Sequence, residues 1–145
     1  MKTITLLVLT LFLAKGCGST GLKKEGDTIS IEYEALTRGT YNKIITKRDT
    51  VITIKDREMK NPIQRTLSTN DWNTILKLMS EINLETVADL KAPTKERFHD
   101  GAMMANITVI YRDKIYKSTT FDHGHPPKEI EKLVEKIIAT SDLNK

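Results

Sequence analysis

The chain has 145 residues, of which 39% are hydrophobic and 29% charged, and its net charge is +4. This length allows one domain of ordinary size, and the composition permits a packed core and excludes general disorder. A single cysteine excludes a disulfide framework and a thiolate zinc cluster, and the glycine-rich nucleotide-binding, HExxH and GxSxG motifs are all missing from the sequence.

Residues 1–16 are expected to form a signal peptide. Lys2 supplies the positive start, and an apolar run of ten residues follows, interrupted only by Thr5 and Thr10. A membrane-spanning helix needs about 20 apolar residues, so this run suits the hydrophobic region of a secretory signal. The small residues Ala14 and Gly16 are typical of a cleavage site.

Cys17, the only cysteine, follows the predicted cleavage site directly. The segment resembles the lipobox of bacterial lipoproteins, in which the cysteine is acylated and becomes the mature N-terminus. It departs from that pattern at Lys15, where a small residue is usual, and its Leu13 lies one position too far upstream. Ordinary secretion is the alternative, but it would leave one unpaired thiol in an oxidising compartment.

We therefore expect a lipoprotein of the bacterial cell envelope, located at the outer membrane. An acylated Cys17, which carries chains such as palmitate, is expected to anchor it in the lipid bilayer. Residues 17–27 are then the lipidated cysteine and a flexible tether. Removal of residues 1–16 takes away two lysines and leaves a net charge of +2, which gives no argument for nucleic acid as a partner.

Residues 28–145 are predicted to form a single domain, which begins with three strands. Residues 28–35 alternate between apolar and polar side chains, as in a half-buried strand. Residues 41–46 and 50–55 predict two further strands, with turns before and between them. Residues 56–65, which contain a proline, predict a polar loop or an edge segment of the sheet.

A helix is predicted over about residues 70–82. Ser68 and Asp71 form a capping signal ahead of an apolar run with helical spacing. The apolar face consists of Trp72, Ile75, Leu76, Met79 and Ile82. Residues 84–90 predict a further helical turn, and residues 91–103 predict a long loop.

A hairpin and a last helix complete the predicted domain. Residues 106–112 and 114–121 are rich in β-formers and flank a short turn. Pro126 and Pro127 are expected in the first turn of the last helix, which has apolar residues at helical spacing from Ile130 to Ile138. The order βββ-α-ββ-α predicts an α+β fold, a small two-layer domain in which two helices pack on one face of an antiparallel sheet.

Four stretches of the predicted domain form a recognisable set: Thr37–Tyr41, Asp71–Trp72, Leu90–Thr94 with Arg97 and Asp100–Ala102, and Phe121–Gly124 with Pro126–Pro127. Together they resemble a group of small lipoproteins of the Bacteroidota, across roughly residues 28–140. The resemblance implies an envelope location and a compact α+β fold, and it implies no activity. His125 departs from the pattern of the group.

All three histidines fall in two predicted loops. His99 precedes Asp100, while His123 and His125 follow Asp122. If the two loops met, these side chains could hold a divalent ion such as Zn²⁺. The structural interpretation is that Asp122 forms an Asx-turn, with a positive φ at the glycine two residues later.

Acid–base catalysis by Asp100, Asp122 and His123 is a further possibility, but no serine or thiol nucleophile in a recognisable motif accompanies them, and we favour a protein without catalytic activity. Arg38 lies at a predicted hairpin tip, where it could bind a carboxylate or a phosphate. Arg97 could pair with Asp100 and fix the long loop. Because a loop of about thirteen residues without secondary structure tends to be functional or well packed, residues 91–103 are a candidate binding surface.

The sequence thus favours a membrane-anchored envelope lipoprotein that acts as a non-catalytic binding or structural module with an envelope protein as partner. The alternative is a protein that binds a divalent metal, with a possible hydrolytic role, through His99, His123, His125 and Asp122.

Overall fold

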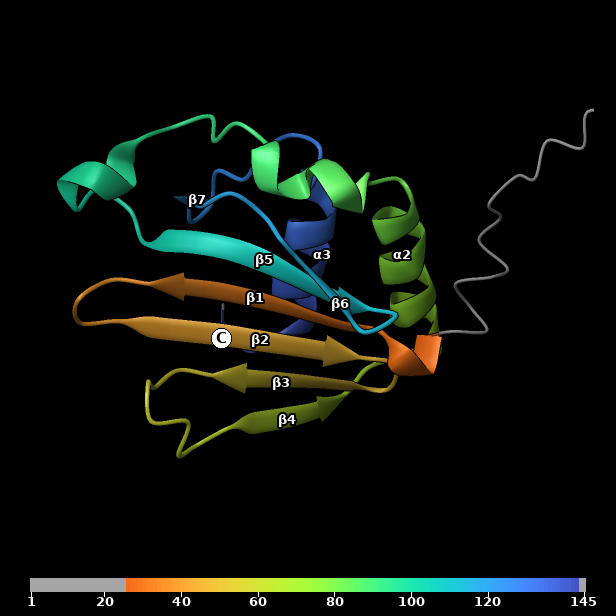
Figure 1. Ribbon diagram of the computed structural model, residues 1–145. Coiled ribbons are helices and arrows are strands. Elements are labelled where there is room, and N and C mark those ends of the chain that lie inside the picture. Colours follow the sequence, from red (N-terminus) through yellow and green to blue (C-terminus); the bar gives the residue numbers. More distant parts are fainter. Residues whose placement is uncertain (1–25, 144–145) are drawn as a thin grey trace, which may run out of the picture.

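The computed structural model describes residues 26–143, which form one antiparallel sheet with helices on one face (Figure 1). The predicted signal peptide, Cys17 and most of the predicted tether lie outside these residues. The sheet order is β4-β3-β2-β1-β5-β6, and β7 also pairs with β5. The strands are β1 (Ser30–Leu36), β2 (Tyr41–Lys47), β3 (Thr50–Ile54), β4 (Ile63–Thr66), β5 (Met104–Tyr111), β6 (Lys114–Lys117) and β7 (Phe121–Asp122).

Two α-helices, α2 (Thr69–Ser80) and α3 (Glu131–Thr140), cover the sheet, and the short 3₁₀ helices are η1 (Gly26–Thr28), η2 (Leu84–Asp89) and η3 (Glu96–His99). The predicted α+β class with two helices on one face is confirmed. Ser68 caps α2 as predicted: its hydroxyl accepts a hydrogen bond from the Asp71 N–H at 3.0 Å. Within residues 26–143, no helix has the length and apolar character needed to cross a membrane.

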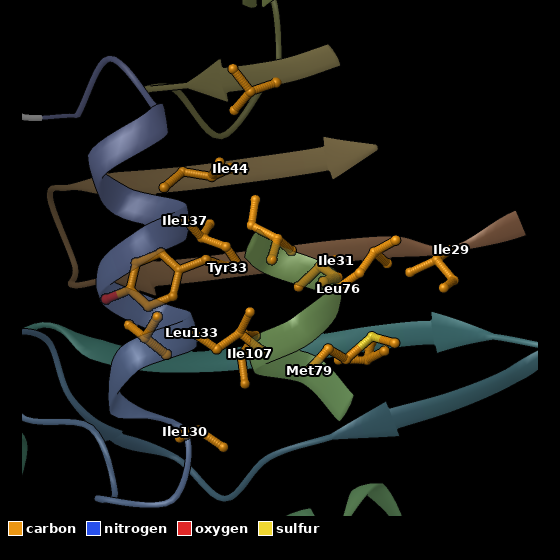
Figure 2. Close-up of a cluster of buried hydrophobic side chains, with 14 of the residues drawn as sticks. Ile29, Ile31, Tyr33, Ile44, Leu76, Met79, Ile107, Ile130, Leu133 and Ile137 are labelled. Carbon is orange, nitrogen blue, oxygen red and sulfur yellow. The ribbon is translucent and has the colours of Figure 1, made fainter. Parts of the chain in front are cut away.

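The core lies between the sheet and the two helices (Figure 2). The predicted alternation of the first strand is confirmed, because Ile31, Tyr33 and Ala35 are fully buried while their neighbours in β1 are only partly covered. The register places Tyr33 opposite Ile44 of β2 and Ile107 of β5, so the central strands contribute one continuous apolar layer. The helices close it with Trp72, Ile75, Leu76, Met79, Leu133, Val134 and Ile137.

The predicted strand over residues 114–121 is wrong in its length, because two short strands replace it. The ladder with β5 ends at Lys117, and the next residue, Ser118, is buried. Its hydroxyl accepts from the N–H of Ile107 at 3.0 Å, and the chain then turns to donate from Thr119 to the carbonyl of Val87 at 3.4 Å. The Ser118 hydroxyl therefore replaces the backbone carbonyl that a continuous strand would offer to the Ile107 N–H. Strand pairing with β5 resumes only at β7.

The last helix begins later than predicted. Pro126 and Pro127 are buried in a turn ahead of it, closed by a bond of 3.1 Å from the Ile130 N–H to the Pro127 carbonyl. The helix α3 starts at Glu131. The prolines thus direct the chain from β7 into the helix without forming its first turn.

The sheet has two distinct ends, which we name by their distance from Gly26, the first described residue. At the proximal end lie η1, the β2–β3 turn and the β5–β6 turn; at the distal end lie the β1–β2 turn, the β3–β4 loop and η3 (Figure 1). The register agrees, since Leu36 at the end of β1 pairs with Tyr41 and Met104. The segments that the sequence marks as candidate binding loops therefore share the distal end.

Candidate functional site

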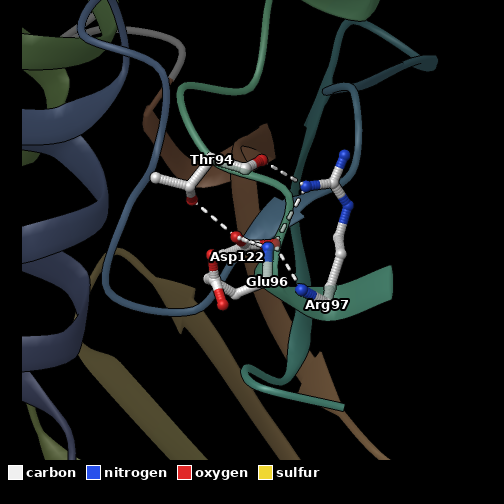
Figure 3. A network of polar contacts seen from close by, with 4 residues as sticks. All are labelled: Thr94, Glu96, Arg97 and Asp122. Carbon is white, nitrogen blue, oxygen red and sulfur yellow. Dashed lines mark hydrogen bonds and ion pairs between the residues drawn. The ribbon is translucent and has the colours of Figure 1, made fainter. Parts of the chain in front are cut away.

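Asp122 holds the long loop to the sheet at the distal end. Its partner in β5 is Met104, so it lies on the opposite face from Phe121, and residues 94–97 cover it completely. Its carboxylate accepts four hydrogen bonds: from the Thr94 hydroxyl at 2.5 Å, from the N–H groups of Glu96 at 2.7 Å and Arg97 at 3.1 Å, and from Arg97 Nη1 at 2.9 Å (Figure 3). The loop is thus tied to β7 by side-chain and backbone contacts together.

Arg97 pairs with Asp122 and not with Asp100, so that predicted pairing is wrong. Its Nη1 also donates to the Thr94 carbonyl at 2.7 Å, and its guanidinium carbon lies 4.4 Å from the centre of the Phe98 ring. Asp100 follows in a left-handed conformation with φ 57° and is exposed. This conformation ends η3, and Asp100 joins Arg97 in the lining of the cleft described below without forming an ion pair with it.

The environment of Asp122 keeps it ionised. Burial raises the pKa of this carboxyl, but the hydrogen bonds from Thr94, Arg97 and Glu96 outweigh burial and hold the pKa well below its usual range. The predicted Asx-turn is wrong, because the carboxylate bonds to another segment and the turn is closed by the His125 N–H on the Asp122 carbonyl at 2.8 Å. The predicted positive φ at Gly124 is confirmed at 87°.

His123 bonds to Tyr33 and not to the carboxylate beside it. The Tyr33 hydroxyl lies 2.6 Å from His123 Nδ1, and the tyrosine is fully buried while the histidine is half-buried. Burial lowers the pKa of His123 and raises that of Tyr33. The pair therefore favours a neutral imidazole that accepts from a protonated phenol, an internal contact between β1 and the chain after β7.

The histidines do not form a metal centre in the described part of the chain. His99 and His125 are exposed, and His123 is engaged by Tyr33. Within residues 26–143, no group of three or more His, Cys, Asp or Glu side chains is placed to hold a metal ion. The convergence that the metal-binding alternative requires is not found, and we do not propose it further.

A cleft of about 250 Å³ lies at the distal end and joins three segments that are remote in sequence. It brings together Arg38 of the β1–β2 turn and Arg97 of η3, both of which the sequence marks as candidates. The third arginine, Arg57 of the β3–β4 loop, was missed. Only sheet pairing reveals it, since the β2–β3 hairpin returns this loop to the β1–β2 turn. The other lining residues are Leu36, Thr37, Asp100, Ala102 and Met104.

Hydrogen bonds fix two of the three arginines. Arg57 donates from Nη2 to the carbonyl of Thr37, which joins the β3–β4 loop to the β1–β2 turn. The Thr37 hydroxyl in turn accepts from the N–H groups of Gly39 at 3.3 Å and Thr40 at 3.1 Å, which stabilises the turn. Arg38 is exposed, and its side chain has no ion pair or hydrogen bond with any residue from 26 to 143. The cleft thus combines a fixed frame with a free guanidinium.

A second hollow of about 460 Å³ adjoins the cleft and shares Arg38 and Arg57 with it. Its lining carries both signs of charge, from Lys55, Asp56, Glu58 and Lys60 among others. The ionisable side chains of this hollow partly compensate one another, as in the ion pair of Lys60 with Glu58. The concentration of positive charge is therefore at the boundary between the two hollows.

Comparison with known proteins gives no match, either to a protein-family model or to a curated protein sequence. The fold and the distal cleft define an α+β domain with a cationic cleft.

Proposed function

We propose that this chain is a lipid-anchored protein of the bacterial envelope whose domain is a non-catalytic binding module. Residues 1–16 carry the features of a signal peptide, and Cys17 follows them in a lipobox-like segment. Acylation of Cys17 would anchor the domain to a membrane without a spanning helix. The outer membrane is the location that we propose.

The observation that supports a binding role is the position of the cleft relative to the N-terminal connection. The described chain begins with η1 at the proximal end, while the β1–β2 turn, the β3–β4 loop and η3 lie at the distal end (Figure 1). These three distal segments carry Arg38, Arg57 and Arg97. The seven residues of β1 alone separate the two ends by about 20 Å. Eight residues lie between Cys17 and Gly26, and this connection spans at most about 30 Å. An anchor at Cys17 would therefore keep the domain within about 30 Å of the bilayer and attach it through the proximal end, opposite to the cleft.

A non-catalytic role is supported by how the candidate acid–base residues are used. The Asp122 carboxylate is saturated by Thr94, Glu96 and Arg97, and the His123 ring bonds to Tyr33. A general base needs a free lone pair within reach of a substrate proton. Both groups instead stabilise the loops that frame the distal end.

The lipid anchor is tested by replacing the cysteine. Cells that express the wild-type chain, Cys17→Ala or the control Ser19→Ala are labelled with an alkyne-tagged palmitate and then fractionated. We expect label and membrane association in the wild type and the control, and neither in Cys17→Ala. Membrane association of Cys17→Ala that equals the wild type would refute the anchor.

The binding role is tested by photo-crosslinking in intact cells. A photoreactive residue replaces Gly39, at the distal β1–β2 turn, where an added Cβ atom would meet no atom within 4 Å. The matched control replaces Lys47, which is exposed at the proximal end. We expect a discrete crosslinked protein from position 39 only. Equal products from both positions, or none from position 39, would count against a distal binding surface.

A further inference from the structure

We infer that the distal cleft binds a carboxylate on a peptide segment of a protein partner, with an apolar side chain next to that carboxylate. The inference rests on the proposed binding role and names the chemistry of its ligand. It depends on the charge balance of the cleft, on the ordered backbone frame that carries its arginines and on its apolar wall.

The charge balance selects an anion with a single charge. The charge of Arg97 is already balanced by Asp122, with Nη1 at 2.9 Å from the carboxylate. Arg38 and Arg57 have no ion pair with any of the described residues, and Asp100 is the acidic residue of the lining. These two cations and one anion leave a single net positive charge. A monoanionic carboxylate neutralises it, whereas a phosphate dianion would exceed it and would be repelled twice as strongly by Asp100.

The geometry suits an oxygen anion because the donors are guanidinium groups on an ordered frame. A guanidinium presents parallel N–H groups that match the two oxygens of a carboxylate. Arg57 is held by the Thr37 carbonyl, and the hydroxyl of Thr37 braces the turn that carries Arg38. Little conformational freedom of the backbone is then lost when a ligand binds.

The wall of the cleft adds an apolar requirement. Leu36, Ala102 and Met104 line it beside the arginines, and Met104 is 46% exposed. An exposed thioether in a cleft is an adaptable contact for an aliphatic side chain. The volume of about 250 Å³ is small for a complete organic ligand but sufficient for one residue of a peptide. Acidic peptide segments and C-terminal residues carry this combination of carboxylate and apolar group.

The test is a titration of the full chain, purified in detergent, followed by NMR of the arginine Nε–H signals. The probes are N-acetyl-leucine, its uncharged amide and inorganic phosphate, at constant ionic strength. We expect saturable shifts with N-acetyl-leucine, and weaker binding of both phosphate and the amide. Arg38→Gln and Arg57→Gln should each weaken the binding of N-acetyl-leucine about tenfold, because each removes a charge-assisted hydrogen bond to the carboxylate. The exposed Arg38 side chain makes no hydrogen bond or ion pair with residues 26–143, so its variant is expected to fold normally.

The matched control is Arg48→Gln, which removes the same charge from the proximal end, where Arg48 pairs with Asp27. It should leave binding unchanged. Equal binding of the amide, tighter binding of phosphate, or an equal loss in Arg48→Gln would overturn the inference, and so would the absence of saturable shifts. The titration requires no membrane, so a negative result would contradict only the carboxylate-binding inference and not the proposed lipid anchor. A negative palmitate label would contradict only the anchor.

Discussion

Replacing Asp122 by asparagine should destabilise the domain more than any change of an exposed charge. The amide matches the carboxylate in shape but offers one oxygen only, and its NH₂ must face either the donors of Thr94 and Glu96 or those of Arg97. It also leaves the Arg97 guanidinium, whose side chain is 10% exposed, without its counter-charge.

The magnitude follows from the burial of the pair. Removing one partner of a buried ion pair costs about 3–5 kcal/mol. The cover over Asp122 is a single segment whose Lys95 and Glu96 are themselves exposed, so we expect the lower end, about 3 kcal/mol. With a urea m-value of about 2 kcal/mol/M, the unfolding midpoint should fall by about 1.5 M. The buried side chain of Trp72, the only tryptophan, reports the transition by fluorescence.

Two variants control for other causes of the loss. Asp27→Asn breaks the pair with Arg48, in which both side chains are 64% exposed, and should cost less than about 1 kcal/mol. Adding Arg97→Gln to Asp122→Asn removes the stranded cation, so the double variant should lose less than the two single losses combined. A midpoint for Asp122→Asn as close to the wild type as that of Asp27→Asn would refute this account of the distal loop.

Three further predictions concern acidity and helix capping. The folded-state pKa of Asp122 lies below its unfolded value near 3.9, so the carboxylate stabilises the domain above that pH and loses this contribution as the pH falls further. Urea midpoints measured from pH 5 to 2.5 should therefore fall more steeply for the wild type than for Asp122→Asn. Burial lowers the pKa of His123, so the folded domain disfavours its protonation and loses stability as the pH falls below the unfolded value near 6.5; an NMR titration of the imidazole should give a pKa below that value, and a value at or above it would contradict this account. Ser68→Ala should cost about 1 kcal/mol through the lost cap of α2, measured by urea unfolding, whereas Ser68→Asn should retain most of the stability.

The local elements were predictable because their signals are short-range. Alternation over residues 28–35 and apolar residues at helical spacing from Trp72 to Met79 each describe which face of one element is buried. The cap at Ser68 likewise spans only four residues. The boundaries failed where a distant group competed, as at Ser118, whose hydroxyl takes the place of a strand bond to Ile107.

The candidate site was only partly predictable. Arg38 was predicted as a candidate from its place at a hairpin tip, and Arg97 from its place in the long loop. Both residues line the cleft. The sequence did not identify Arg57 as a candidate, because the composition of a polar loop does not predict which segment the loop packs against. The histidines and Asp122 were grouped by closeness in sequence, and the structure gave each a different partner.

Sequence patterns alone predicted five of the seven strands within residues 26–143, both α-helices, the two-layer α+β class and the features on which the proposed lipid anchor depends. Each strand, helix and targeting feature is encoded in the residue types of a short segment, and the fold class follows from the order of those segments. The contact of Asp122 with a segment 25–28 residues earlier, and that of Tyr33 with His123 across 90 residues, emerged from the three-dimensional fold. Such contacts depend on the register of the sheet and on how the loops close over its ends, because pairing β1 with β5 positions side chains that no local pattern connects.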